Sequence, residues 1–267
     1  MMYGAIIGDV VGSPYEFSRN KRKDFSPLFR PDGGITDDTI MTVAIADSLL
    51  NEIHPAVSMR DWGRRVLPTE SLGGYGKGFI KWLAAPEIQP PYNSFGNGAA
   101  MRVSPVGWLF DDLAVVLEVA KLVTEVSHSH PEGIKGAQAV AMSVYLARKG
   151  GDPQSIREAV AEMFGYDMDR DVAICQAEHV YNETCQYCVP EALICAFEAH
   201  SYEDAIRNAI SLGGDADTLA AIAGSVAEPL FEIPDDLIDS VQPYLAPEIT
   251  PVITRFYAEL TTRQERL

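Results

Sequence analysis

The amino-acid sequence predicts an all-α fold, for three reasons. Apolar residues recur at three- and four-residue intervals along most of the chain, which is the spacing of one helix face. These segments are bounded by helix signals: Pro131 and Pro153 suit a first helical position, whereas Gly150-Gly151 and Gly213-Gly214 suit left-handed helix ends. Little of the chain shows the alternating polarity of a strand. We therefore expect a protein built from helices.

Each predicted helix follows from the same signals, taken in chain order. Residues 37–51 come first, because Thr and Asp stand at their start and apolar residues follow at helical spacing. A later helix is predicted to begin at Pro190, which is followed at once by Glu191. After 37–51 the pattern predicts seven more helices, and the helix that begins at Pro190 is one of them. Their ranges are 111–126, 131–149, 153–164, 190–199, 202–211, 217–229 and 250–266.

Three irregular segments are longer than ordinary connections: 8–36, 71–78 and 90–108. They are rich in Gly, Pro, Asn and Ser, and loops of this length on a helical scaffold usually carry function or are disordered. The glycine-rich stretch at 73–78 is suited to line the mouth of a cleft. Since no internal repeat and no Ser- or Pro-rich linker divides the chain, we predict one domain, 1–267.

The composition narrows the class of protein. The 267 residues are 47% hydrophobic and 22% charged, which is the balance of a globular protein with a substantial core. A net charge of −17 repels a phosphate backbone and argues against nucleic acid as a stable partner. The chain has no long uncharged apolar run, and its N-terminal apolar run is interrupted by Asp9, which argues against a membrane span and a signal peptide. We expect a cytoplasmic monomer with no membrane partner.

All four cysteines fall within one short stretch of the chain. Cys185 and Cys188 have the spacing of a zinc site, but Cys175 and Cys195 do not form a second such pair. The residues between them have helical spacing. Buried reduced thiols of a cytoplasmic protein are therefore the favoured interpretation, with a zinc site as the alternative.

Two acidic clusters stand at predicted helix starts. Thr36-Asp37-Asp38-Thr39 precedes one apolar run, and Gly213-Gly214-Asp215-Ala216-Asp217-Thr218 precedes another. A helix cap explains either cluster alone, because Thr and Asp oxygens accept hydrogen bonds from free backbone N–H groups and acidic residues suit the positive end of the helix dipole. One cap needs one oxygen, however, whereas the two clusters together bring four carboxylates that would repel one another without a cation.

All-oxygen ligands select hard ions, so the clusters favour Mg²⁺ or Mn²⁺ over Zn²⁺. This hypothesis requires residues about 180 positions apart to meet in space, which their spacing does not determine. Glu16 is a third acidic candidate, in a loop bounded by Gly and Pro. Considered alone, it has the properties of a surface glutamate.

Five motifs follow one another along the chain: Gly8-Asp9-Val10-Val11-Gly12-Ser13-Pro14-Tyr15-Glu16, Thr36-Asp37-Asp38-Thr39, Ser94-Phe95-Gly96-Asn97-Gly98-Ala99-Ala100-Met101-Arg102, Ser127-His128-Ser129-His130-Pro131 and Gly213-Gly214-Asp215-Ala216-Asp217-Thr218. In this order they resemble the motifs of the ADP-ribosylglycohydrolase family. The resemblance extends from residue 4 to about residue 231 and so covers nearly the whole chain. One such motif would be weak evidence, but five in order are specific.

The resemblance implies a compact single-domain orthogonal helical bundle, with long functional loops around a two-metal cleft. It implies hydrolysis of the bond between the anomeric carbon of the distal ribose of ADP-ribose and an acceptor, so the partner would be an ADP-ribosylated protein or an ADP-ribose-containing small molecule. Glu16 and Asp38 are the expected catalytic residues, which would orient the water or the leaving group. Two Mg²⁺ or Mn²⁺ ions would be held by Thr36, Asp37, Asp38, Asp215, Asp217 and Thr218.

Two further motifs are expected to bind the substrate. Glycines in the 94–98 loop would let backbone N–H groups approach a phosphate, although a tight turn is the plain alternative. The resemblance implies that this loop contacts the diphosphate and the distal ribose, and that His128 contacts the substrate, whereas His130 is expected to be structural. The predicted substrate-binding residues are Ser94, Phe95, Gly96, Asn97, Gly98 and His128.

One stretch of positive charge stands out in this acidic chain, comprising Arg19, Lys21, Arg22, Lys23 and Arg30. Its simplest interpretation is a solvated loop. Because it lies between Glu16 and Thr36, the alternative is a cleft rim that attracts a doubly charged diphosphate.

Other functions are weighed against hydrolysis. An inactive ADP-ribose-binding or structural relative is one, although every motif Asp and Thr is present. A helical isoprenoid synthase needs a third Asp where this chain has Met41, and a nucleotide pyrophosphohydrolase needs paired ExxE clusters that have no counterpart at a matching place. Among arginine, serine, O-acetyl and nucleic-acid linkages, the sequence does not select the acceptor.

Overall fold

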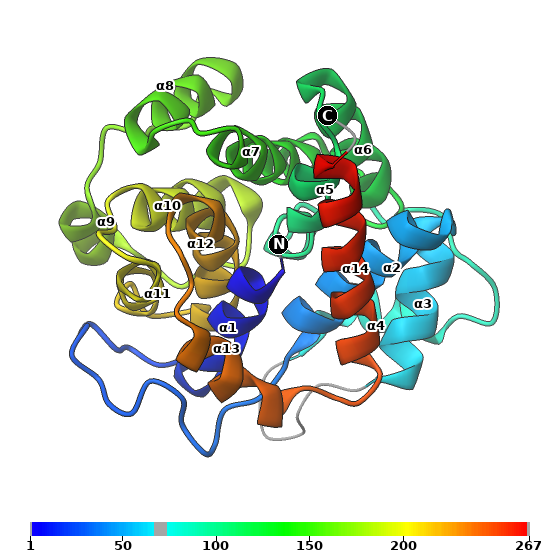
Figure 1. The fold of residues 1–267 in the computed structure, drawn as a ribbon, viewed down its shortest axis with the longest axis horizontal. Coiled ribbons are helices and arrows are strands. Elements are labelled where there is room, and N and C mark those ends of the chain that lie inside the picture. The colour runs from blue at the N-terminus through cyan, green and yellow to red at the C-terminus, as the bar shows by residue number, and fades with distance from the viewer. Residues whose placement is uncertain (1, 67–73, 266–267) are drawn as a thin grey trace.

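A computed structural model describes residues 2–66 and 74–265, and within these ranges every regular element is a helix (Figure 1). Two isolated bridges, between Ser18 and Gly214 and between Gly96 and Thr184, are the only β-type pairings there. The all-α prediction is confirmed. The α-helices are α1 (Tyr3–Gly12), α2 (Asp37–Asn51), α3 (Pro55–Arg65), α4 (Lys77–Ala84), α5 (Ser104–Leu109), α6 (Leu113–Glu125), α7 (Pro131–Arg148), α8 (Pro153–Phe164), α9 (Val172–Glu178), α10 (Cys185–Phe197), α11 (Tyr202–Ile210), α12 (Ala216–Leu230), α13 (Asp235–Val241) and α14 (Ile249–Gln264), with short 3₁₀ turns η1 (Ser13–Tyr15), η2 (Asn97–Ala99) and η3 (Gln242–Tyr244).

Most predicted helices are found close to their predicted bounds. The range of α8 matches, and α7 and α11 each end one residue early, whereas the predicted helix 250–266 corresponds to α14, with residue 266 outside the described residues. The prediction that a helix begins at Pro190 is wrong, because α10 begins at Cys185 and contains this proline. Proline cannot donate a backbone hydrogen bond, but α10 is buried without interruption from Cys188 to Phe197, and this packing outweighs the lost bond.

Six helices were not expected from the sequence: α1, α3, α4, α5, α9 and α13. Consequently, all three predicted irregular segments contain helical residues: α1 and η1 enter 8–36, the start of α4 enters 71–78, and η2 and α5 lie in 90–108. The omission of α1 has a physical cause. All of its residues after Tyr3 are buried, so the helix has no polar face to alternate with an apolar one.

Helix α1 packs against α12 at very short range, because small residues line both helices. An ideal Cβ on Gly8 would overlap the carbonyl oxygen of Ala220, and one on Gly4 would overlap that of Gly224. Gly12 meets Ala216 in the same way one turn further on. The two helices, about 200 residues apart in sequence, therefore lie side by side with their backbones in contact (Figure 1).

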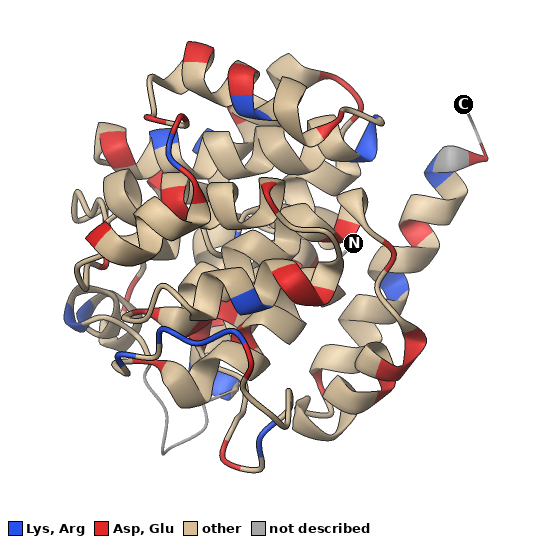
Figure 2. Ribbon diagram, turned by 90° about the vertical axis from the view of Figure 1, so that its left-hand side faces the viewer, with Lys and Arg blue, Asp and Glu red and all other residues tan. Residues whose placement is uncertain are grey.

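The buried apolar residues form one core that extends from Met2 to Leu260. Helix α14 contacts α2 at the edge of this core (Figure 1). The four cysteines lie in the core as buried free thiols, and burial raises the pKa of Cys185 to about 12. Acidic residues are distributed over many helices rather than gathered on one (Figure 2). Within the described ranges, none of the helices is both long and apolar enough to cross a membrane.

Candidate active site

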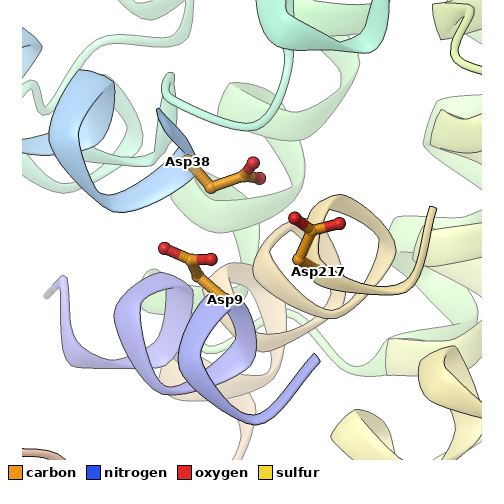
Figure 3. A group of neighbouring side chains, drawn as sticks. All are labelled: Asp9, Asp38 and Asp217. Carbon is orange, nitrogen blue, oxygen red and sulfur yellow. The ribbon is translucent and has the colours of Figure 1, made fainter. Parts of the chain in front are cut away.

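Three carboxylates from three helices converge at the point where α1, α2 and α12 meet (Figure 3). Asp9 of α1, Asp38 of α2 and Asp217 of α12 each offer an oxygen, and these oxygens lie within 4.8 Å of one another. All three residues are buried. The two acidic clusters of the sequence therefore do meet, through Asp38 and Asp217, and the contact between α1 and α12 adds Asp9 to them.

The start of α2 is held by hydrogen bonds to Asp9. Thr36 caps the helix, because its side chain accepts a hydrogen bond from the backbone N–H of Asp38 at 3.2 Å, which confirms the predicted capping role. The Thr36 hydroxyl donates to Asp9 Oδ1 at 2.8 Å, and the backbone N–H groups of Thr36 and Thr39 both donate to Asp9 Oδ2 at 3.0 Å. Asp9 thus links α1 to the first turn of α2.

A second carboxylate group forms beside the first. Oxygens of Glu16, Asp215 and Asp217 lie within 4.8 Å of one another. Glu16 is placed there by main-chain bonds between its loop and the start of α12: Phe17 N–H donates to Gly214 O, and Gly214 N–H donates to Ser18 O, both at 2.9 Å. The turn needs glycine at this point, since Gly213 and Gly214 have φ values of +76° and +77°.

Burial makes this centre unfavourable for unneutralised carboxylates. It raises the pKa of Asp9 to about 6 against the effect of its hydrogen bonds, and it raises that of Asp37 to about 7, with Asp9 and Asp215 adding to the shift. The pKa values of Asp38, Asp215 and Asp217 are raised chiefly by the same burial. In the part of the chain that the structure describes, no Lys or Arg forms an ion pair with any of them.

These residues fit divalent cations. Asp38 Oδ1 is buried without a hydrogen-bond partner, and a hard cation would satisfy such an oxygen. The donors are carboxylates and hydroxyls only, which suits Mg²⁺ or Mn²⁺. Cys185 and Cys188, the pair with zinc-like spacing, lie in the core and belong to neither acidic group.

The remaining predicted metal ligands lie around these groups. Thr218 Oγ1 donates to Asp38 Oδ2 at 3.1 Å, and Asp37 lines the adjoining cavity without belonging to either carboxylate group. Asp9 was not predicted as a site residue, because in the sequence it interrupts an apolar run. The signal that could have identified it is its place in the Gly8-Asp9 motif, if that motif had been recognised as part of a helix.

A cavity of about 670 Å³ opens from the carboxylates. Ser94, Gly96, Asn97, Gly98 and His128 all line it, as expected for substrate-binding residues. Asn97 also joins the loop to the carboxylates, since its Nδ2 donates to Asp215 Oδ2 at 2.5 Å. Residues 74–78 line the cavity as well, whereas residues 71–73 of that predicted loop lie outside the described residues.

Phe95 and His130 do not line this cavity. Phe95 is 42% exposed, and its ring stands edge-on to His130, with 5.1 Å between ring centroids. His130 caps α7 by accepting a hydrogen bond from Glu132 N at 3.1 Å, which confirms its structural role. Sequence reasoning missed the cavity residues Tyr92 and Glu183, which lie outside the motifs, and it assigned no role to Arg102 at the end of the 94–102 motif.

The basic stretch does not line the cavity. Lys21 Nζ donates to the carbonyls of Gln176 and Leu212, which ties the loop to α9 and to the turn before α12. Arg22 and Arg30 form exposed ion pairs with Asp24 and Asp32. Among the described residues the cations that line the cavity are Lys77 and Arg102, so the alternative interpretation of the basic stretch as a cleft rim is not supported.

Comparison with known proteins agrees with this geometry. The family model described as ADP-ribosylglycohydrolase matches residues 1–265. The ADP-ribosylhydrolase ARH3 of Mus musculus is 28% identical, over 84% of this chain and 80% of its own, and the ADP-ribosylarginine hydrolase Tri1 of Pseudomonas putida is 25% identical, over 87% and 70%. A solved structure of an ADP-ribosylglycohydrolase-related protein complex superposes with a TM-score of 0.71 at 22% identity, covering 96% of this chain and 95% of that one. The chain belongs to the ADP-ribosylglycohydrolase family of hydrolases.

Proposed function

We propose that this hydrolase, acting as one domain over residues 1–267, uses divalent metal ions to release ADP-ribose from a modified protein side chain. The reaction would break the bond at the anomeric carbon of the distal ribose. One observation carries the proposal: a single cavity is lined both by buried carboxylates and by a glycine-containing loop. The names of two relatives, ADP-ribosylhydrolase and ADP-ribosylarginine hydrolase, describe the same kind of reaction and support the proposal.

Two ions, Mg²⁺ or Mn²⁺, are the proposed cofactors. Such ions supply Lewis acidity and fixed positive charge, which can orient ribose hydroxyls and favour deprotonation of a water. The proposal rests on the raised carboxylate pKa values and on the unpartnered Asp38 Oδ1, both of which a cation would relieve. The residues proposed to hold the ions are Thr36, Asp37, Asp38, Asp215, Asp217 and Thr218.

Glu16 and Asp38 are the proposed catalytic residues. Cleavage at the anomeric carbon passes through a transition state with oxocarbenium character, which nearby carboxylates stabilise. The position of Glu16 beside Asp215 and Asp217 supports a role for it in orienting the water or the leaving group. Asp38 shares the other carboxylate group with Asp217 and would orient the same reacting centre.

The rest of the cavity is proposed to hold the ADP part of the ligand. A volume of about 670 Å³ is within the range of cavities that enclose a molecule of this size. Gly96 and Gly98 have no side chain to obstruct the close approach of a diphosphate, and Ser94, Asn97 and His128 would add polar contacts. Phe95 stands outside this lining and would meet only a part of the ligand that projects from it.

A hydrolysis panel tests the proposal. The protein, with Mg²⁺ or Mn²⁺, is offered peptides carrying ADP-ribose on arginine or on serine, together with O-acetyl-ADP-ribose and an ADP-ribosylated oligonucleotide. We expect release of free ADP-ribose from at least one peptide, abolished by EDTA and restored by adding the metal. Tight binding of ADP-ribose without turnover of any substrate would instead identify an inactive relative.

A further inference from the structure

Arg102 is a buried cation in the wall of the cavity. Only 1% of its surface is exposed, and none of the described carboxylates forms an ion pair with it. Its guanidinium instead approaches two neighbouring polar side chains. One Nη donates to Ser127 Oγ at 2.9 Å and lies 3.4 Å from His128 Nδ1. Burying a charge without an ion-pair partner has a large desolvation cost, so we expect Arg102 to have a function.

These contacts favour a proton on one particular nitrogen of His128. A guanidinium only donates, so its N–H faces His128 Nδ1 comfortably only if that nitrogen is a bare acceptor. Ser127 Oγ accepts from Arg102 and lies 2.8 Å from Nδ1, so its hydroxyl can donate to a bare Nδ1. Burial and the adjacent Arg102 charge lower the pKa of His128 well below its usual value, which leaves the ring neutral.

The other ring nitrogen faces the glycine loop. An ideal Cβ on Gly98 would lie 3.3 Å from His128 Nε2, and one on Gly96 would lie 3.7 Å from it. Among the described residues nothing accepts a hydrogen bond from Nε2, although His128 lines the cavity. The absence of two Cβ atoms thus leaves space beside a nitrogen that is directed into the cavity.

We propose that Arg102 and Ser127 are positioning residues, which hold His128 as a neutral imidazole protonated on Nε2 so that it donates a hydrogen bond to a ligand oxygen. Neither residue touches the ligand in this role; both act through the imidazole. His128 then works as a fixed donor in a water-poor wall and not as an acid or base. A phosphate oxygen is the favoured acceptor, because it is anionic and the two glycines leave space for it beside Nε2.

The first test needs no ligand, and its result is taken from the wild-type protein. Nitrogen-15 NMR of histidine-labelled protein at pH 7, with His128→Asn to assign its signals, reports the protonation of both ring nitrogens. We expect a protonated Nε2 and an unprotonated, hydrogen-bonded Nδ1. A ring protonated on Nδ1, or on both nitrogens, would overturn the proposal.

The second test uses Ser127→Ala, which removes the hydroxyl from a buried site while changing little volume, with Ser129→Ala as a matched control in the same segment. We expect the Ser127 variant to lose the single Nε2–H signature and to bind ADP-ribose five- to tenfold more weakly, with Mn²⁺ affinity unchanged. Retention of both the signature and the affinity would contradict the positioning role. This role rests on the proposed function only for the ligand: if the wild type does not bind ADP-ribose, the proposed function fails, whereas the NMR result still decides the tautomer.

Discussion

Two groups of buried charge of opposite sign lie at the cavity. One is the group of carboxylates from α1, α2 and α12 that face one another, here called the acidic end. The other is Arg102, which lies in the wall beside His128. Burial raises the carboxylate pKa values, and it lowers that of Arg102 to about 10. In both groups, therefore, burial disfavours the charged form of the side chain. Each group would gain from a ligand of opposite sign, a cation at the first and an anion at the second.

The largest effect is expected from Asp217→Asn, because Asp217 belongs to both carboxylate groups. This variant should lose divalent-ion binding and reduce turnover by at least about 1000-fold, which corresponds to about 4 kcal/mol in the barrier. Calorimetry with MnCl₂ and the release of ADP-ribose measure the two effects. Asp236→Asn, at an exposed position of α13, serves as the control. Full ion binding by the Asp217 variant would show that the acidic end is not a metal centre.

The acidic end also depends on the close approach of α1 and α12. In Gly8→Ala, the added Cβ overlaps the carbonyl of Ala220, and the helices must separate. We expect the free energy of unfolding to fall by about 3 kcal/mol, as for overpacked cores, in urea denaturation. Gly76→Ala is the matched control, because a Cβ there meets nothing within 4 Å. Equal stability of the two variants would mean that the helices can move apart freely.

The sequence predicts some of the helices much better than others. Helices α7 and α8 were predictable because a proline opens each of them and their ends carry ordinary signals. Helix α1 was not, since it is buried on every side and shows no amphipathic pattern. Its glycine spacing at positions 4, 8 and 12 matches the small residues of α12, but only the packed structure shows which helix lies opposite.

Some residues of the candidate site could also be predicted from the sequence, and others could not. The acidic clusters were predictable in composition, yet their meeting depends on contacts between segments about 200 residues apart. Asp9 was missed because, within the sequence, it resembles an interruption of an apolar run. Arg102 was read only as the end of a motif, since its burial and its contact with His128 depend on how α7 and the 94–102 loop pack together.

The acidic end should give the metal-free protein an unusual dependence on pH. The pKa of Asp9 is about 6 and that of Asp37 about 7 in the folded protein, both above the value near 3.9 expected after unfolding. Protonation therefore favours the folded state, fully below about pH 4, and this stabilisation is lost as the pH rises through 6 and 7. In EDTA, we expect unfolding at pH 8 to cost on the order of 4 kcal/mol less than at pH 5.

Divalent ions should reverse this dependence, because they bind the ionised carboxylates and only the folded protein presents the site. Thermal unfolding with and without MnCl₂ across this range measures both effects. Higher stability at pH 8 than at pH 5 in EDTA would contradict the assignment of these carboxylates as unneutralised groups. Asp217→Asn should reduce the stabilisation by MnCl₂, whereas Asp236→Asn should not.

The smallest effect is expected beside His128, from Gly98→Ala. The backbone of Gly98 is not in the left-handed region, so alanine is compatible with the fold, but its Cβ would lie 3.3 Å from His128 Nε2. We expect ADP-ribose to bind about tenfold more weakly, about 1.4 kcal/mol, since the methyl group would occupy the space beside the proposed donor. Metal affinity and the free energy of unfolding should stay near the wild-type values, because no carboxylate ligand is affected.

Calorimetry with ADP-ribose and with MnCl₂ measures the ligand affinity and the metal affinity of Gly98→Ala separately. Gly76→Ala is again the control, as a cavity residue with open space around it. Unchanged affinity for ADP-ribose would show that the ligand does not use the space between Gly98 and His128.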